Sequence, residues 1–243
     1  KLNDLTLSGL AVSQAVFNSK KPEGLNVLCD VGKDNTQVLI FNDRRLVHYQ
    51  IITSGGDDLT TSLSQELNLS YSLAEEVKVS YGRIQNKGDA QDKEIIIKKD
   101  NSYFTLSQNL VIQVLSRASN QIANSIRDAV RPHLLAISSL SFPDKTTLYV
   151  SGRTVCLDGF LELLEAVIGM PVKLAKVDNP SLLVPLMRHR ILSGEPILNY
   201  LTCLGLIAKA IKPSYKRSVA LSGFRDLLSY ISGRIKEIYR EYF

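Results

Sequence analysis

The pattern of apolar and polar positions at the start of the chain predicts one helix followed by three short strands. Residues 5–17 (LTLSGLAVSQAVF) are apolar at helical spacing. The polar stretch at residues 20–24, which contains proline and glycine, ends this helix. Strands are predicted at residues 25–30, 37–41 and 44–52, with a hairpin turn at residues 42–43. The sequence therefore opens with a helix and a β-meander.

Beyond this meander, predicted helices alternate with short strands. A helix capped by Asp58 is expected to begin near Leu59, and a second is capped by Ser70 or Ser72, which opens a capping box. A long helix is predicted over residues 107–135, ended or kinked by Pro132. Further strands are predicted at 94–98, 147–150 and 172–175, and further helices at 158–168, 180–191, 197–211 and 219–243. This alternation predicts an α/β domain with a mixed sheet.

Composition argues against some classes of binding site but does not identify a function. The chain has 243 residues and a net charge of +5, and its basic residues are spread without interleaved aromatics, so no nucleic-acid partner is predicted. Its three cysteines lie in apolar runs, which predicts buried free thiols in a reducing compartment. The three histidines are far apart in sequence and no Cys/His spacing typical of a metal site occurs, so no metal site is expected.

Neither a signal peptide nor an apolar run of about 18 residues is visible in the sequence. The chain begins at Lys1 rather than at a methionine, and whether it is a piece of a longer protein stays open. A membrane span in the remainder of such a protein would be compatible with this sequence.

Four segments carry a resemblance to a known family. LCDVGKDNTQVLI at residues 28–40, GGDDLT at 55–60 and AEEVK at 74–78 follow one another, and LYVSGRTVCLDGF lies further on at 148–160. Their order resembles the second phosphate loop, the following glycine pair and helix, and the adenosine loop of actin-like ATPases. The pattern is similar to that of the PilM and FtsA families more than to that of sugar kinases.

This resemblance implies a fold and a domain organisation. The expected fold is α/β, an actin-like (ribonuclease H-like) mixed sheet with flanking helices, and a partial fold centred on the second lobe. The order of the motifs also implies that the strand near residues 147–150 joins the sheet of the opening meander. The lobe is expected at residues 1–212, with a small subdomain inserted at about residues 83–141, and a C-terminal amphipathic helix at 213–243. The resemblance covers residues 5–212, without a first phosphate loop or the inserted subdomain that precedes this lobe in the two families.

The resemblance also implies a nucleotide site. In the family the aspartate of the phosphate loop lies near the metal and the attacking water, a hydroxyl contacts phosphate, and a helix approaches the base. The corresponding residues are Asp30, Gly32, Thr36, Glu75, Lys78 and Gly152. Without the resemblance, the same residues indicate a simple strand–turn–strand hairpin and an exposed ion pair on a helix.

The two loops depart from the family pattern at glycine positions. Residues 33–35 (Lys-Asp-Asn) replace small residues, and Arg153 replaces a glycine of the adenosine loop. Glycines allow close backbone approach to a nucleotide, and the Asp34 carboxylate would repel phosphate by about 1 kcal/mol or more. We therefore expect no enzyme activity and no cofactor. Weak binding of ATP with Mg²⁺ stays open, and any activity would be that of an ATPase.

The last helix carries an apolar stripe spaced four, three, four and three residues apart. Its members are Phe224, Leu228, Ile231, Ile235 and Ile238. Such spacing is typical of a coiled-coil seam or of a one-sided apolar face. Packing against the lobe, contact with a partner helix or a second copy, and adsorption to a membrane surface are all open, although mixed charge on the polar face disfavours the last.

The function that the resemblance implies is a non-enzymatic actin-like scaffold of a bacterial cell-envelope assembly. The candidates are the inner-membrane platform of a type IV pilus or of type II secretion, whose L component also resembles this chain in lacking good nucleotide loops. The alternative is an FtsA-like cell-division ATPase that polymerises at the membrane, and a small-molecule kinase is a third. Expected partners are inner-membrane assembly proteins or division proteins, with homo-oligomers and peripheral or tethered membrane association open. The expected location is the cytoplasm, at the inner face of the cytoplasmic membrane.

Overall fold

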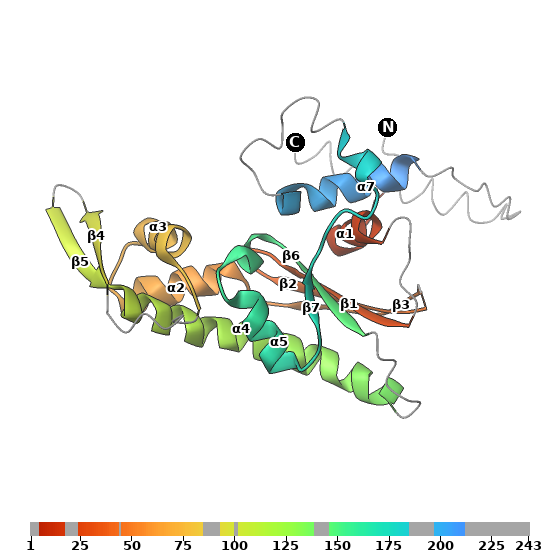
Figure 1. Ribbon diagram of the computed structural model, residues 1–243, viewed down its shortest axis with the longest axis horizontal. Helices are drawn as coiled ribbons and strands as arrows, with labels where there is room; N and C mark the ends of the chain where they lie inside the picture. The colour runs from red at the N-terminus through yellow and green to blue at the C-terminus, as the bar shows by residue number, and fades with distance from the viewer. Residues whose placement is uncertain are drawn as a thin grey trace, which may run out of the picture. The chain divides into compact units, whose positions relative to one another are not determined.

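The first three strands form the meander that the sequence predicts. The computed structural model describes residues 5–17, 24–43, 45–84, 93–99, 102–138, 146–184 and 197–211. Within these residues, the main sheet contains β1 (Leu25–Val31), β2 (Thr36–Asn42), β3 (Arg45–Ile52), β6 (Thr147–Ser151) and β7 (Val172–Leu174). Their order across the sheet is β3-β2-β1-β6-β7 (Figure 1).

The sheet is mixed because β1 has a different kind of neighbour on each side. It pairs antiparallel with β2, which pairs antiparallel with β3. On its other side β1 pairs parallel with β6, and β6 pairs parallel with β7. The prediction that the strand near residues 147–150 joins the meander in one sheet is confirmed, as is the α/β class with flanking helices.

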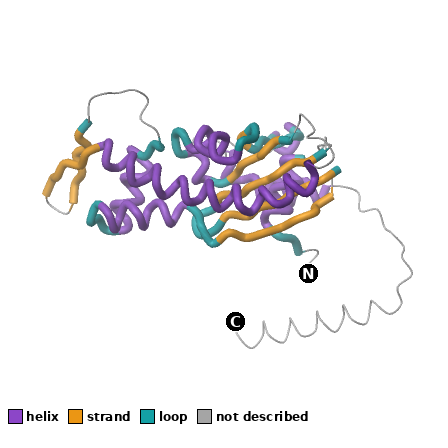
Figure 2. The backbone as a smooth tube through the Cα atoms, turned by 90° about the horizontal axis from the view of Figure 1, so that it is seen from below, coloured by secondary structure: helices purple, strands orange, loops and turns teal. Residues whose placement is uncertain are grey.

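Helices cover both faces of the sheet. They are α1 (Ser8–Val16), α2 (Gly56–Glu66), α3 (Tyr71–Tyr81), α4 (Gln108–Ser138), α5 (Phe160–Ile168) and α7 (Leu201–Ile211), with short 3₁₀ helices η1 (Arg153–Cys156), η2 (Pro180–Leu182) and η3 (Ile197–Tyr200). Side chains of α4 and α5 pack on one face of the sheet, and those of α1 and α7 pack on the other (Figures 1 and 2). Among the described helices, none is both long and apolar enough to span a membrane.

Alternation along β1 and β2 supplies both cores. Val27 and Cys29 of β1 belong to the cluster shared with α4 and α5, whereas Leu28 of β1 and Leu39 of β2 belong to the cluster shared with α1 and α7. All four side chains are fully buried. Burying an aliphatic side chain of this size contributes about 1.5–3 kcal/mol. The central strands are therefore apolar on both faces, as a sheet between two helical layers requires.

A second, two-stranded sheet precedes α4. It pairs β4 (Glu94–Lys99) with β5 (Ser102–Ser107) in antiparallel register, and no strand of the main sheet pairs with it in the described part of the chain. Ile95 and Ile97 of β4 point inward and join the core of α4, while Ile96 faces solvent. These strands lie inside the range expected for the small subdomain, whose boundaries stay a prediction.

One predicted helix start was wrong, and of the two effects predicted for Pro132 the end of the helix is excluded. α4 continues through Pro132 to Ser138. Pro132 is exposed, as is Asp128 one turn earlier, so water can bond the carbonyl that loses its N–H partner. The cap predicted at Asp58 lies instead inside the first turn of α2, which begins at Gly56.

α3 begins after Ser70, whose hydroxyl accepts a hydrogen bond from the Leu73 backbone N–H at 3.4 Å. This settles the choice between the two serines and places Ser72 inside the helix. Of the helix expected at residues 180–191, the described part forms η2, a turn at Leu183 and one helical residue at Val184. The amphipathic helix expected at 219–243 lies outside the described residues.

The environments of cysteine and histidine differ from expectation. Cys29 is buried, but Cys156 in η1 and Cys203 in α7 are exposed. His48 on β3 and His133 on α4 are not isolated, because their ring centroids lie 3.9 Å apart. The two rings come together because α4 packs against β3, a contact that the distance between the residues in sequence does not reveal.

Candidate functional site

The candidate site lies where the parallel strands β1 and β6 end side by side. Asp30 and Ser151 are paired in the register of these strands, and the Ser151 hydroxyl donates to Asp30 Oδ1 at 2.8 Å. In α/β sheets, ligands bind outside the carboxyl ends of parallel strands. Asp30, predicted as the family aspartate, and Gly152, which follows Ser151, therefore meet at this edge as the resemblance implies.

Asp30 is a partly buried carboxyl group. Burial raises its pKa above the ordinary value of 3.8, and the hydrogen bond from Ser151 opposes this shift without cancelling it. Among the described residues, Ser151 is the one side chain that bonds this carboxylate. The charge of Asp30 is therefore held at a cost, which is a feature common at functional sites.

The turn between β1 and β2 is closed on itself. The Gly32 N–H donates to the Asn35 carbonyl at 3.0 Å. Lys33 and Asp34 are exposed at its tip. Thr36, expected as a phosphate contact, is fully buried, and its hydroxyl donates to the Ser54 carbonyl at 2.8 Å. In this arrangement Thr36 ties β2 to the end of β3.

The first N–H groups of α2 are bonded within the protein. The Gly56 N–H donates to the Gly32 carbonyl at 2.9 Å, and the Asp57 N–H donates to the Lys33 carbonyl at 2.8 Å. The Gly55 N–H donates to the Asp58 carboxylate at 2.8 Å. Unpaired N–H groups at a helix N-terminus are the usual donors to phosphate. Here three of these donors contact carbonyl or carboxylate oxygens instead.

Gly152 connects the third segment to this cluster. Its φ of +94° is a conformation that favours glycine, and a Cβ there would lie 2.1 Å from the Val31 carbonyl oxygen. Two residues later, the Thr154 hydroxyl donates to the Gly32 carbonyl at 3.1 Å. The Gly32 carbonyl thus joins all three segments, and Gly152 serves close backbone packing.

Glu75 and Lys78 on α3 belong to a bonded group at the start of α2. The Lys78 amine donates to the Gly56 carbonyl at 3.0 Å, to the Thr60 hydroxyl at 2.7 Å and to Glu75 Oε2 at 2.7 Å. The Thr60 hydroxyl donates to Glu75 Oε2 at 2.5 Å. Burial alone raises the pKa of Glu75, but the bonds from Lys78 and Thr60 outweigh it and hold the pKa below its usual range. All three protons of the Lys78 amine therefore have acceptors.

Sequence reasoning missed a contact at the first turns of α2 and α3. The Tyr71 hydroxyl donates to the Asp57 carboxylate, and this bond raises the pKa of Tyr71. The Lys33 amine lies 3.7 Å from Asp57 Oδ1 and 5.7 Å from the centre of the Tyr71 ring. No spacing signal predicts this contact, because its three members come from separate segments.

These interactions define what the site can do chemically. The described residues contain no group of three His, Cys, Asp or Glu side chains that could hold a metal ion. Asp30 offers a single carboxylate, and the adjacent N–H, hydroxyl and amine donors are engaged by protein oxygens. Of the predicted residues, Asp30, Gly32 and Gly152 lie together, while Glu75 and Lys78 join them through Gly56. The predicted stripe Phe224, Leu228, Ile231, Ile235 and Ile238 lies outside the described residues.

Comparison with solved structures shows an actin-like fold. PilM in the PilM–PilN type IV pilus biogenesis complex superposes with a TM-score of 0.59 at 16% identity, covering 86% of this chain and 53% of PilM. MreB5 of Spiroplasma citri bound to AMPPNP superposes with a TM-score of 0.55 at 14% identity, covering 77% of this chain and 60% of MreB5. The partial coverage of both neighbours agrees with the partial fold that was expected.

Comparison with sequences is more specific. The cell division protein FtsA of Enterococcus hirae is 23% identical over 175 residues, 71% of this chain and 38% of that protein. FtsA of Streptococcus pneumoniae is 25% identical over 214 residues, 87% of this chain and 45% of that protein. The chain thus spans about half the length, or less, of these relatives. The family model of the cell division protein FtsA matches residues 27–191, which include both loops of the site. The chain belongs to the FtsA family.

Proposed function

We propose that this chain is the actin-like lobe of a bacterial cell-envelope assembly protein that acts by binding other proteins rather than by hydrolysing ATP. Membership of the FtsA family supports a division assembly over a type IV pilus or type II secretion platform, although PilM is a structural neighbour. The proposed partners are division or inner-membrane assembly proteins, and the proposed location is the inner face of the cytoplasmic membrane. Self-association is part of this proposal.

The observation that carries the proposal is the engagement of the Gly32 carbonyl. It accepts from the Gly56 N–H at 2.9 Å and from the Thr154 hydroxyl at 3.1 Å. A nucleotide in this crevice would need N–H donors and an open backbone surface. The three loop segments bond each other instead, so a nucleotide would have to displace existing hydrogen bonds, and each displaced bond costs about 0.5–1.5 kcal/mol.

The side chains at the loop tips add to this cost. Asp34 is exposed at the turn after β1, where a phosphate would approach a like charge. Arg153 occupies the first position of η1, directly after Gly152. Arg153 is exposed, at a position where the resemblance implies a glycine and bare backbone. These residues therefore support the proposal that the site does not fit a nucleoside triphosphate.

A phosphate-release assay tests the proposal. The native chain and the double variant Asp34→Gly, Arg153→Gly are each incubated with Mg-ATP. The Asp30→Asn variant is the control. We expect no release above buffer from the native chain or from the control. Magnesium-dependent turnover by the native chain that is lost on Asp30→Asn would contradict the proposal.

The alternative is an FtsA-like ATPase that polymerises at the membrane. Asp30 favours it, because a partly buried carboxylate with a raised pKa is kept at a cost to stability. High-speed pelleting with Mg-ATP, Mg-ADP and no nucleotide separates the two candidates. Polymer that forms only with Mg-ATP supports the ATPase, whereas assembly independent of nucleotide supports the scaffold.

A further inference from the structure

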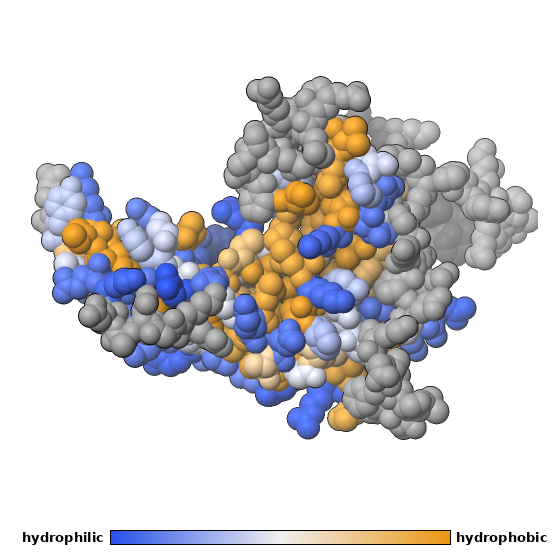
Figure 3. Space-filling view, viewed as in Figure 1, coloured by the Kyte–Doolittle hydropathy of each residue, from blue (hydrophilic) through white to orange (hydrophobic). Residues whose placement is uncertain are grey.

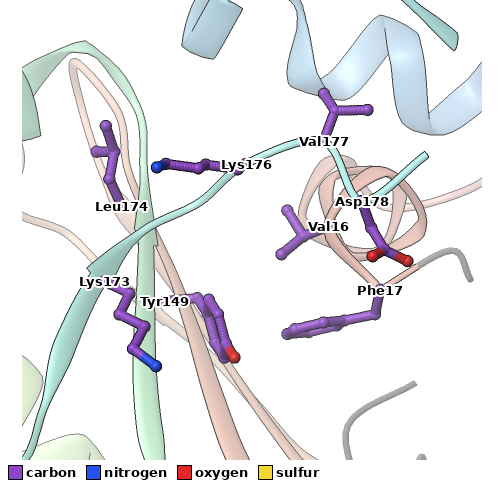
Figure 4. Close-up of a pocket in the computed structure, with 8 residues that line it drawn as sticks. All are labelled: Val16, Phe17, Tyr149, Lys173, Leu174, Lys176, Val177 and Asp178. Carbon is purple, nitrogen blue, oxygen red and sulfur yellow. The ribbon is translucent and has the colours of Figure 1, made fainter. Parts of the chain in front are cut away.

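A cavity of about 590 Å³ lies on the α1 side of the sheet, beside β7 (Figure 4). Val16 and Phe17 at the end of α1, together with Tyr149 of β6, form its apolar wall. Lys173 of β7 and Lys176 of the following loop also line it. None of the loop residues of the candidate nucleotide site contributes to its lining. Its volume is in the range of ordinary ligand pockets.

The wall of this cavity is held in place from several sides. The Phe17 ring meets the Tyr149 ring edge to face at 5.2 Å, and it meets Phe41 in the same way at 5.6 Å. The segment opposite is also fixed, because the Ala175 N–H donates to Val150 at 2.7 Å and the Asp178 N–H donates to Ala15 at 3.0 Å. A cavity with such walls is preformed, which lowers the entropic cost of binding.

Two lysines give the cavity a positive rim. Lys173 pairs with Tyr149 in the strand register, so it lies on the same face of the sheet as the aromatic wall. Both Lys173 and Lys176 are exposed, and neither forms an ion pair within the described residues. Asp178 also lines the cavity but has interactions of its own. Figure 3 shows apolar and hydrophilic residues intermingled over β7 and α7. A ligand with an apolar group beside negative charge would match this surface.

β7 is also the last strand of the sheet in the described part of the chain. The Pro171 carbonyl and the Ala175 N–H bond β6. Because backbone groups alternate along a strand, the N–H and carbonyl groups of Val172 and Leu174 point away from β6. Within the described residues no backbone group bonds them, so they can pair with an additional strand, the mode in which many domains capture extended peptides.

We propose that the cavity and the edge of β7 together bind an extended acidic segment of another protein. The segment adds to the sheet beside β7, places an apolar side chain against Phe17 and Tyr149, and presents carboxylates to Lys173 and Lys176. The edge is what favours a peptide over a free anion, since a small molecule would leave the outward N–H and carbonyl groups of β7 unused.

The test uses the full chain and a fluorescein-labelled nine-residue peptide of sequence Gly-Glu-Thr-Phe-Thr-Glu-Thr-Glu-Gly, whose phenylalanine and glutamates share one face of an extended strand. Binding is followed by fluorescence anisotropy in 150 mM salt. We expect saturable binding that weakens at least tenfold in the double variant Lys173→Glu, Lys176→Glu. The matched control Lys98→Glu, Arg131→Glu makes the same change in net charge at exposed positions far along the chain, and it should bind like the native protein. Thermal melts of all three proteins check that each variant is folded.

Methylation of the peptide backbone tests the strand pairing without altering the protein. Amides of an added strand point alternately toward and away from β7, so methylating one alternate set should abolish binding and methylating the other should not. The proposal is overturned if binding does not saturate by about 1 mM, or if both charge variants weaken it equally. It is also overturned if neither methylated set matters, or if benzoate alone displaces the peptide with equal potency.

Discussion

Replacing Gly205 by alanine tests the close crossing of α1 and α7. A Cβ at residue 205 would lie 1.7 Å from the Ala11 carbonyl oxygen and 2.4 Å from its carbon. Ordinary contacts of a Cβ begin near 3.4 Å, so the two helices would have to move apart by more than an ångström. The contact is with backbone atoms, which cannot rotate away as a flexible side chain could.

The expected cost follows from what that movement disturbs. The crossing buries one apolar layer, formed by Val12, Ala15, Leu201, Leu204 and Ala208. Overpacking of this kind costs about 1–3 kcal/mol, and loosened packing around the crossing adds to it. Alanine gains about 1 kcal/mol over glycine in a free helix, which offsets part of the loss. We expect a net destabilisation of about 2–3 kcal/mol, which lowers Tm by about 4–12 °C for a chain of this size.

The assay is urea denaturation followed by circular dichroism, with thermal melting as a second measure. Leu206→Ala is the control, since Leu206 lies on the same helix with 46% of its surface exposed and should change stability by less than about 1 kcal/mol. If Gly205→Ala leaves the midpoint unchanged or raises it, the close approach of α1 and α7 is wrong.

Three further predictions concern charge and the tail. Burial raises the pKa of Asp30 above 3.8, so its stabilising contribution is present below that pH and lost as pH rises through the folded-state value; Asp30→Asn should therefore raise Tm at pH 7 but not at pH 3. Burial and the neighbouring His48 lower the pKa of His133 below 6.5, so the stability contributed by His133 is lost as pH falls through its folded-state pKa. The Tm of His133→Asn should therefore change less between pH 7 and pH 5 than the Tm of the native chain. If the proposed apolar stripe of the last predicted helix forms a contact between copies, the double variant Ile231→Asp, Ile235→Asp should be a smaller species in light scattering, with the same Tm as the native chain. An oligomer that persists in this variant would oppose that role.

The sequence pattern predicted the strands of the main sheet well, because each strand and each turn is marked by residues that are neighbours in the sequence. β1 and β2 read as short apolar strands joined by a turn, and Ser70 stands directly before a helical run. The presence of β6 in the same sheet as the meander was predicted from the resemblance rather than from periodicity, and its pairing with β1 was not predicted. The expectation that proline ends a helix failed at Pro132. This residue is tolerated inside α4 because it is exposed, so solvent can bond the carbonyl that loses its N–H partner.

The membership of the candidate site stays a prediction from the motifs, and the bonding of its residues could not be predicted from the sequence. Asp30, Gly32 and Gly152 could be named from motifs, since glycine and aspartate mark loops of this kind. The roles of Thr36 and Thr154 could not, because each hydroxyl bonds a carbonyl that is distant in sequence. Likewise, His48 and His133 meet only through the packing of α4 on the sheet. Such contacts depend on tertiary geometry, which no spacing in a single sequence encodes.

The loops after β1 and β6 carry the central claim, and isothermal titration calorimetry with Mg-ATP tests it most directly. The account predicts no binding tighter than about 1 mM, equivalent to about −4 kcal/mol, and a measurable gain in affinity when Arg153→Gly restores a glycine after Gly152. The Asp30→Asn variant serves as the blank titration. Saturable binding of Mg-ATP to the native chain in the micromolar range would contradict the account.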